Sequence, residues 1–324
     1  MTAAELLLAQ PRGFCAGVVR AIDVVEQALD LFGAPVYVFH EIVHNGHVVQ
    51  QLRQRGAVFV GRIDQIPPQA VTIFSAHGVS QAVVDQASAR GLRVIDATCP
   101  LVAKVQLQAQ RYAQAGRTVL VIGHPGHDEV VGTLGRIQGP AHVVPTAEAA
   151  RALDLPASTA LAYVTQTTLS VDDTRGIIAV LQQRFPDIVG PALADICYAT
   201  QNRQTAVRLM ARRVDRLLVV GAHNSSNASR LREVGAQQGV PAWLVEDASQ
   251  IDPDWLQGAR CIGVTAGAST PEHLVQGVCE RLRALGAGAV RQLPGKPESV
   301  QFRLPHGLAE ARGQAAPAPD LATP

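Results

Sequence analysis

The sequence lacks several features that would place it in a broad class. No apolar run approaches the roughly 20 residues that cross a membrane, and the N-terminal "MTAAELLLAQPRG" has no basic stretch before its short apolar run. A secretion signal is therefore not expected. The formal net charge is only +1, which argues against a broad electrostatic surface for nucleic acid or an anionic membrane. These absences predict a cytoplasmic protein with no nucleic-acid or membrane partner.

Several chemical motifs are also missing. There is no C-x-x-C pair, which argues against a zinc ribbon or a thioredoxin-type site. The five cysteines are odd in number and widely spaced, so disulfides are not expected. Neither G-x-G-x-x-G nor G-x-x-x-x-G-K-[ST] occurs, so no dinucleotide or Walker-type site is expected. Any electrons needed for a reduction would have to come from another protein.

What the chain does contain is an alternation of short apolar runs and helical stretches. The runs are four to seven residues long and rich in Val, Ile and Leu, as buried parallel strands are. A helical stretch over 17–33 ends at Gly33, as a helix often does. This alternation predicts parallel sheets covered by helices. The runs are "VYVF", "VTIFS", "LRVIDAT", "TVLVIG", "LAYVT", "RLLVVGA" and "RCIGVTA".

The loops between these segments repeat three times. Each repeat begins with a cysteine that opens a helix, at Cys15, Cys99 or Cys197. A first polar loop follows 29, 28 and 28 residues later, and a second loop follows the next strand. Such a period indicates tandem structural units. The equivalent positions are His44, His127 and Ser225 in the first loops, and His77, Thr167 and Ser269 in the second loops.

We therefore predict an α/β fold of three tandem units with mainly parallel sheets. The units span 1–95, 96–193 and 194–304, and an irregular Ala- and Pro-rich tail covers 305–324. Functional loops of parallel sheets gather at the carboxyl ends of the strands. A pseudo-threefold trefoil of such units would direct its loops at one central site.

The three repeated cysteines point to a metal. A lone free cysteine is usually a small buried hydrophobe, and that interpretation suits Cys261 in a strand and Cys279 on a helix. A helix N-terminus favours thiolate over thiol, and three converging thiolates match a soft-metal site. An iron–sulfur cluster normally has four cysteine ligands, so three would leave one iron open to substrate. A three-cysteine zinc site is the alternative.

The polar loops predict an anion site. Histidine, serine and asparagine donors at helix N-termini suit a phosphate or diphosphate, although each residue alone also fits a structural histidine or a helix cap. Glu129 lies among apolar residues beside a histidine loop. Desolvation there would raise its pKa toward a value useful for proton delivery, whereas a capping or solvated glutamate is the alternative. Thr167 and Thr168 would connect it to a substrate through their hydroxyl groups.

A set of motifs, in order from about residue 6 to 304, resembles the LytB family of 4-hydroxy-3-methylbut-2-enyl diphosphate reductases. No single motif suffices, but together they are specific. They are "QPRGFCAGV", "HEIVHN", "SAHGVS", "DATCPLV", "GHPGHDEVVGT", "TQTTLSVDDT", "CYATQNRQ", "NSSNASRL" and "GVTAGASTP".

The resemblance implies a monomeric trefoil that holds a [4Fe–4S] cluster and takes electrons from ferredoxin or flavodoxin. It implies a two-electron, two-proton reductive dehydroxylation that gives isopentenyl and dimethylallyl diphosphate, the last step of the non-mevalonate isoprenoid pathway. Glu129 would be the proton source, with Thr167 near the substrate hydroxyl, and His127 would be a third catalytic residue. The implied cluster ligands are Cys15, Cys99 and Cys197. The implied diphosphate ligands are His44, His77, His127, Ser225, Ser226, Asn227 and Ser269.

Two other hypotheses compete with this one. A Cys/His zinc hydrolase of a phosphorylated substrate would use the same residue types. A non-enzymatic iron–sulfur sensor would use the cysteines alone, but the Glu129 and Thr167 pair beside an anion site favours chemistry over sensing.

Overall fold

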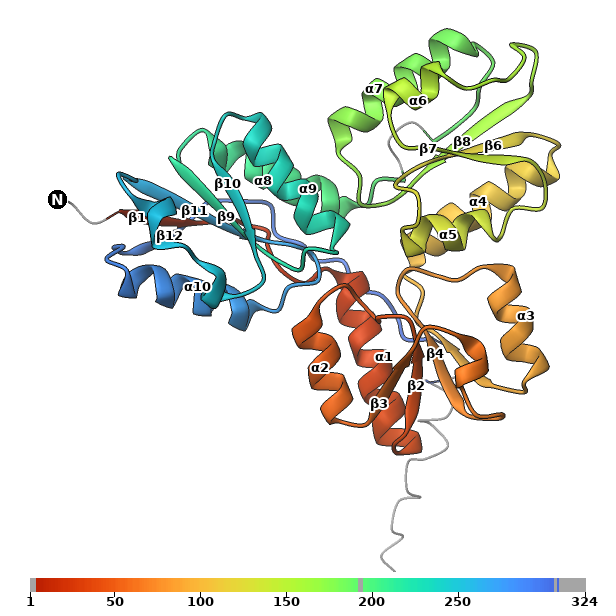
Figure 1. Ribbon diagram of the computed structural model, residues 1–324, viewed down its shortest axis with the longest axis horizontal. Helices are drawn as coiled ribbons and strands as arrows, with labels where there is room; N and C mark the ends of the chain where they lie inside the picture. The colour runs from red at the N-terminus through yellow and green to blue at the C-terminus, as the bar shows by residue number, and fades with distance from the viewer. Residues whose placement is uncertain (1–3, 192–194, 306–307, 309–324) are drawn as a thin grey trace, which may run out of the picture.

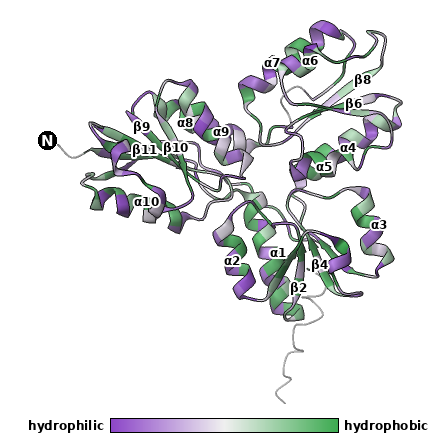
Figure 2. Ribbon diagram, in the orientation of Figure 1, coloured by the Kyte–Doolittle hydropathy of each residue, from purple (hydrophilic) through white to green (hydrophobic). Residues whose placement is uncertain are grey.

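Three lobes surround a common centre in the computed structural model, which describes residues 4–191, 195–305 and 308. Each lobe has its own sheet, and every named strand pair in the three sheets is parallel (Figure 1). The hydrophobic residues concentrate in the strands and on the helix faces that cover them (Figure 2). The predicted α/β trefoil is thereby confirmed, because strands apolar on both faces need helices on both faces.

The first lobe is built on a sheet with the order β3-β2-β4-β5. Two apolar clusters pack in it, one around α1 and one beneath α3. Its elements are α1 (Ala16–Phe32), β2 (Val36–Phe39), α2 (Gly46–Gln54), β3 (Ala57–Val60), η1 (Ile63–Gln65), β4 (Val71–Phe74), α3 (Gln81–Ala89) and β5 (Arg93–Asp96).

The second lobe has the smallest sheet, with the order β7-β6-β8. Its strand β8 is buried along its whole length. The elements are α4 (Pro100–Gln114), β6 (Thr118–Ile122), α5 (Asp128–Leu134), β7 (Ala141–Val144), α6 (Ala147–Arg151), β8 (Leu161–Thr165) and α7 (Val171–Arg184).

The third lobe has a five-stranded sheet with the order β10-β9-β11-β1-β12. Its elements from the C-terminal third of the chain are α8 (Tyr198–Ala211), β9 (Arg216–Val220), α9 (Ser226–Gln237), β10 (Ala242–Val245), η2 (Ala248–Gln250), η3 (Pro253–Leu256), β11 (Cys261–Ala266), α10 (Glu272–Ala284) and β12 (Val290–Gln292). The remaining strand, β1 (Glu5–Leu8), comes from the other end of the chain.

The position of β1 corrects part of the expected domain division. The sequence suggested that residues 1–95 form one unit, but β1 pairs with β11 and β12 in the third lobe. The reason is the apolar run Leu6–Leu8, which is buried between those strands. The described part of the chain therefore begins in the third lobe and enters the first lobe only at α1.

The C-terminal segment makes the reverse connection. After β12 it runs back to the first lobe, where the backbone carbonyl of Arg303 accepts a 2.7 Å hydrogen bond from the Arg20 side chain. Leu304 and Leu308 pack against the core around α1, and Leu308 is only 1% exposed. The expected irregular tail, 305–324, otherwise lies outside the described residues. Both ends of the described chain thus tie the first and third lobes together.

The seven strands expected from apolar runs all form, as β2, β4, β5, β6, β8, β9 and β11. The sequence missed the other five, β1, β3, β7, β10 and β12. Four of these, β3, β7, β10 and β12, lie at a sheet edge, and β1 lies next to one. Of the helices within the described residues, none combines the length and the apolar character needed to span a bilayer.

Candidate active site

One pocket lies where the three lobes meet, and all of the predicted site residues line it. This convergence was expected from the repeat but could only be tested with coordinates. The lining includes Cys15, Cys99, Cys197, His44, His77, His127, Glu129, Thr167, Thr168, Ser225, Ser226, Asn227 and Ser269. The two remaining cysteines lie elsewhere, Cys261 at the start of β11 and Cys279 on α10, as the sequence suggested.

The three cysteines occupy equivalent positions. Each is the N-cap of its helix, Cys15 for α1, Cys99 for α4 and Cys197 for α8. Each also donates its backbone N–H to a carbonyl in the second polar loop of another repeat. Cys99 bonds to Ala76 at 3.0 Å, Cys197 to Thr167 at 3.1 Å and Cys15 to Ala268 at 3.1 Å. This ring of hydrogen bonds joins the lobes in threefold fashion around the pocket.

The same bonds correct the alignment of the second loops. They make Ala76, Thr167 and Ala268 equivalent, so the residues that follow them, His77, Thr168 and Ser269, form the next equivalent set. The sequence spacing had paired Thr167 with His77 and Ser269, which is wrong by one residue. Thr168, and not Thr167, therefore occupies the position equivalent to His77 and Ser269. The Thr167 hydroxyl instead bonds to Glu129.

Two of the thiols have a higher pKa than their position at a helix N-terminus suggested. Burial raises the pKa of Cys99 to about 11 and that of Cys197 to about 12, and the neighbouring thiols add to the effect. The expectation that helix N-termini alone favour thiolate is therefore wrong for these two, because desolvation outweighs the dipole. Metal binding reverses this balance by displacing the thiol protons.

The surroundings of the thiols fit a bulky multi-atom metal group. A Cβ placed on Gly17 would lie 2.8 Å from the Cys99 sulfur and 3.8 Å from the Cys15 sulfur, so only glycine leaves this space open. Soft thiol donors from three helices with no fourth cysteine in the pocket lining match a three-cysteine iron–sulfur site.

Glu129 is a buried acid held by one neighbour. Its side chain is 2% exposed, and its carboxylate accepts hydrogen bonds from the Thr167 backbone N–H at 2.6 Å and the Thr167 hydroxyl at 2.9 Å. Desolvation raises the pKa of Glu129 to about 7 despite these bonds. The expected shift is confirmed in direction, and the carboxyl can hold a proton near neutral pH.

His127 has a fixed tautomer. It is the N-cap of α5, and its Nδ1 accepts a hydrogen bond from the Glu129 backbone N–H at 3.1 Å. The ring proton therefore resides on Nε2, which leaves Nε2–H as the donor available to a ligand. Burial lowers the pKa of His127 to about 4, so the ring is neutral at physiological pH. The helix cap and the proposed ligand contact thus use different nitrogens.

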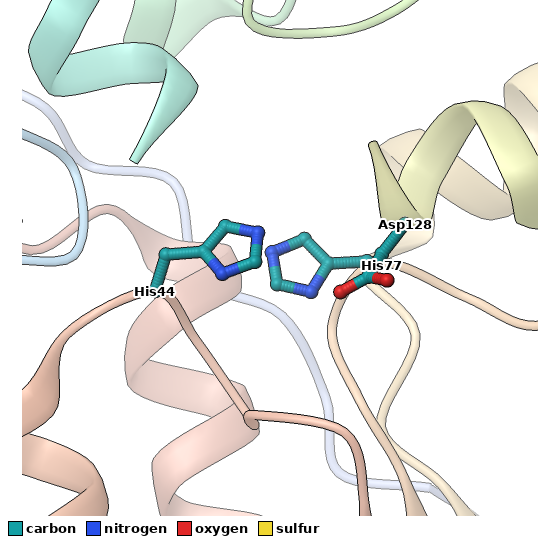
Figure 3. A group of neighbouring side chains, drawn as sticks. All are labelled: His44, His77 and Asp128. Carbon is teal, nitrogen blue, oxygen red and sulfur yellow. The ribbon is translucent and has the colours of Figure 1, made fainter. Parts of the chain in front are cut away.

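Three imidazoles form one cluster in the pocket. The His44 and His77 rings stack with centroids 4.1 Å apart, and His127 packs edge-on against both. Figure 3 shows the His44 and His77 rings next to each other with the Asp128 carboxylate close by. Ligand atoms of His44, His77 and Asp128 all lie within 4.8 Å of one another. Burial also lowers the pKa of His77 well below its ordinary value.

Asp128 has a partner across the lobe boundary. His40 Nδ1 lies 2.9 Å from its carboxylate, and this bond joins the first lobe to α5. Burial acts to raise the pKa of Asp128, but the bond from His40 and the nearby imidazoles outweigh it and lower the pKa to about 2. The carboxylate is therefore charged at neutral pH, next to the imidazole cluster.

The third lobe contributes donors that do not titrate. Ser225 caps α9 by accepting from the Ala228 N–H, so its predicted capping role exists beside its place in the pocket. Ser269 donates its hydroxyl to the His44 carbonyl at 2.9 Å. Asn227 accepts from the Ala268 N–H at 2.8 Å, which orients its amide.

Several polar residues at the site were not foreseen. Gln166 accepts from the His124 N–H and donates to the Thr168 and Ser226 hydroxyls, so it links the second lobe to the third. Thr200 contacts the Cys197 sulfur at 3.2 Å through its hydroxyl. Its position three residues after an N-cap cysteine was the available signal, since N-cap side chains bond to this position.

Comparisons with known proteins show which family the chain is similar to. The family model described as LytB protein matches residues 6–283. The chain is 60% identical over 311 residues to the 4-hydroxy-3-methylbut-2-enyl diphosphate reductase of Bordetella pertussis, covering 96% of each. It is 57% identical over 304 residues to the protein of that name from Zymomonas mobilis, covering 94% of this chain and 89% of the relative.

A solved structure has the same fold. The Plasmodium falciparum protein described as E-1-hydroxy-2-methyl-but-2-enyl-4-diphosphate reductase superposes with a TM-score of 0.92 at 36% identity, covering 97% of this chain and 99% of that one. The matches favour the reductase hypothesis over the zinc hydrolase and the sensor. The chain belongs to the LytB family.

Proposed function

We propose that the central pocket binds 4-hydroxy-3-methylbut-2-enyl diphosphate and reduces it to isopentenyl and dimethylallyl diphosphate. The reductase activity is the one carried by the names of its relatives. The observation that carries the assignment to this pocket is the position of Glu129. A buried carboxyl with a pKa of about 7 lies in the same lining as three thiols and a cluster of anion-binding donors.

Cys15, Cys99 and Cys197 would hold an iron–sulfur cluster, proposed as [4Fe–4S]. When bound, it would supply electrons and an iron open to the substrate oxygen. The protein positions this group by its three N-cap cysteines, whose backbone N–H groups are held by the ring of inter-lobe hydrogen bonds.

The diphosphate would be held from two sides. Imidazole N–H groups of His44, His77 and His127 face it from the first and second lobes. Hydroxyl and amide groups of Thr168, Ser225, Ser226, Asn227 and Ser269 supply uncharged donors. Among the described residues that line the pocket there is no lysine or arginine, so directed hydrogen-bond donors would orient the anion through geometry rather than bulk charge.

Glu129 and Thr167 would deliver the proton. The overall change replaces the substrate C–OH by C–H and releases water, and it consumes two electrons and two protons. Glu129 holds one proton on its carboxyl near neutral pH. The Thr167 hydroxyl, which is hydrogen-bonded to this carboxyl, would connect it to the substrate oxygen. Burial of both residues keeps bulk water away from this step.

We further propose that ferredoxin or flavodoxin provides the electrons and that the chain acts as a cytoplasmic monomer. All five cysteines are free, which suits a reducing compartment.

The test is anaerobic purification followed by iron, sulfide and zinc determination and a visible spectrum. We expect iron and sulfide in near-equal amounts and a brown protein; a colourless, zinc-only protein would contradict the proposal. Cys99→Ser should lose the cluster and the activity together. The matched control is Cys261→Ser, which lies in β11 away from the pocket and should retain both.

A further inference from the structure

The chain has only two lysines, Lys104 and Lys296, against 26 arginines. They lie far apart in sequence, Lys104 on α4 and Lys296 in the segment after β12. Both line one cavity of about 380 Å³, separate from the central pocket. Both lysines of the chain therefore lie at one site. This local positive charge is not apparent from the net charge of +1.

This lysine cavity adjoins the cysteine site. Cys197 and Tyr198 line both the cavity and the central pocket, and Leu101 is shared as well. The wall between the two spaces is therefore the first turn of α8 together with the start of α4. Tyr198 also accepts a hydrogen bond from the Ala16 N–H, next to Cys15. A partner bound over this cavity would be separated from the thiols only by the residues that line both spaces.

The exposed charge of the cavity is positive. Both lysines are exposed, and neither has a hydrogen bond or a salt bridge to another of the described residues. Among the described residues that line the cavity, Asp195 is the only acid, and it is buried at 3% exposure. Burial raises the pKa of Asp195, although the nearby charge of Lys104 acts to lower it. Glu298, near Lys296 in sequence, is engaged with the buried Arg203. The two ammonium groups are thus available to an acidic partner.

An apolar side chain accompanies the charge. Leu107 is 47% exposed and lies three residues after Lys104 on α4, so the two share a helix face. Weak electron-transfer interfaces are small, and they combine charge steering with a little apolar contact. Lysine suits such a surface better than arginine, because its hydrated, flexible ammonium steers from a distance without a rigid bidentate contact.

We propose that the lysine cavity is the docking site of a small acidic electron-transfer protein, with Lys104 and Lys296 as its charge contacts and the Cys197 wall as its route to the cysteine site. This inference rests on the proposed function. In each encounter the donor is oxidised by one electron and the metal group at the cysteines is reduced by one. Two encounters supply one turnover, while protons enter separately through the pocket.

Cross-linking tests the surface without requiring turnover. A carbodiimide joins an amine to a carboxylate as an amide with loss of water, and the only amines that this chain offers are Lys104, Lys296 and the N-terminus. Cross-links through these amines are distinguished by mass spectrometry from those between carboxylates of this chain and amines of the probe. With an acidic flavodoxin as the probe, we expect cross-linked peptides at Lys104 and Lys296 that disappear at high salt. Cross-links confined to the N-terminus, or none, would overturn the proposal.

Kinetics give the second readout. The variant Lys104→Glu, Lys296→Glu should lose at least about tenfold in the rate driven by reduced flavodoxin, since reversed charges repel the donor. It should keep the rate driven by dithionite and methyl viologen. The control Arg212→Glu, Arg213→Glu carries the same charge change at the far end of α8, roughly 20 Å along the helix from Cys197, and should keep both rates. Lys104→Arg, Lys296→Arg should also keep both.

The outcomes separate the two proposals. Loss of the flavodoxin-driven rate in both reversal variants would show a net-charge effect and overturn the docking site. An unmodified protein that fails to turn over with methyl viologen would refute the proposed function. The cross-linking result would still decide whether an acidic protein binds at the lysine cavity.

Discussion

The two sides of the central pocket use different chemistry at equivalent positions. The first and second lobes present the titratable groups His44, His77, His127 and Glu129, whereas the third lobe presents Ser225, Ser226, Asn227 and Ser269. The backbone bonds of the three N-cap cysteines are nevertheless the same in all lobes. The three repeats therefore place side chains at equivalent positions around the pocket, but the residue types at those positions differ between the lobes. Because the third-lobe thiol Cys197 keeps its proton at neutral pH, changes of pH near neutrality should act on the histidine and glutamate side of the pocket.

The titratable side contains a sharper contrast. Asp128 and Glu129 are neighbours in the first turn of α5, yet the pKa of Asp128 is lowered to about 2 and that of Glu129 is raised to about 7. Asp128 has His40 as a partner, while Glu129 is buried against the uncharged Thr167. Because Asp128 has a partner of opposite charge, it stays ionised. Because Glu129 is buried without such a partner, it can carry a proton.

The largest effect is expected when the proton carrier is removed. Glu129→Gln should lower turnover by about 100-fold or more, with the metal content unchanged. The amide can still accept from the Thr167 N–H and donate to its hydroxyl, so the geometry survives. Steady-state rates with methyl viologen and iron analysis measure this. The control is the exposed Glu148→Gln; a Glu129→Gln protein with normal turnover would refute the proton role.

The unmodified protein should also lose activity with rising pH. Glu129 holds its proton below about pH 7 and gives it up above that value, so turnover should decline as pH increases through this range. Glu129→Gln should show a much flatter profile over the same range.

The same substitution should change how stability depends on pH. Below about pH 4.5 Glu129 is neutral in both the folded and the unfolded chain. Between that value and about 7 only the unfolded chain ionises, so the unmodified protein loses stability relative to Glu129→Gln. The difference should reach roughly 3 kcal/mol and then stay level. Urea unfolding of both proteins in the same metal state measures it; a constant difference across this range would contradict the buried-acid assignment.

The next prediction separates the two sides of the pocket. His127→Asn keeps an N-cap acceptor but removes the Nε2 donor, and Ser226→Ala removes a hydroxyl from the third lobe. We expect KM to rise about tenfold for His127→Asn and about fivefold for Ser226→Ala. Only the histidine variant should weaken the pH dependence of KM.

The reason for this difference is proton uptake. The rings of His77 and His127 are neutral in the ligand-free pocket, and a bound diphosphate raises the pKa of imidazoles that it contacts. Affinity should therefore fall as pH rises through the pKa values of the liganded rings. Calorimetry in buffers of different ionisation enthalpy would detect the protons taken up; equal heats in all buffers would contradict the explanation.

Sequence reasoning found the groups and missed the links between them. The lobes and the thirteen lining residues were predictable because apolar strands and repeated loop chemistry are local signals. The ring of cysteine N–H bonds, the one-residue shift at Thr168 and the bridge through Gln166 were not predictable. They depend on how separate lobes dock. The exchange of β1 into the third sheet was missed for the same reason, since strand order across lobes has no local signature.

The smallest effect is expected at the fixed anion. Asp128→Asn should return the raised pKa of His40 to its ordinary value. The stability lost should stay below about 1 kcal/mol, because the pair is partly exposed. Asp128 contributes above about pH 4, and His40 contributes until pH rises through its own raised pKa, so the loss should appear between these limits. NMR titration of His40 measures it, with the exposed Asp187→Asn as control. An unchanged His40 titration would contradict the assignment of Asp128 as the partner that raises the pKa of His40.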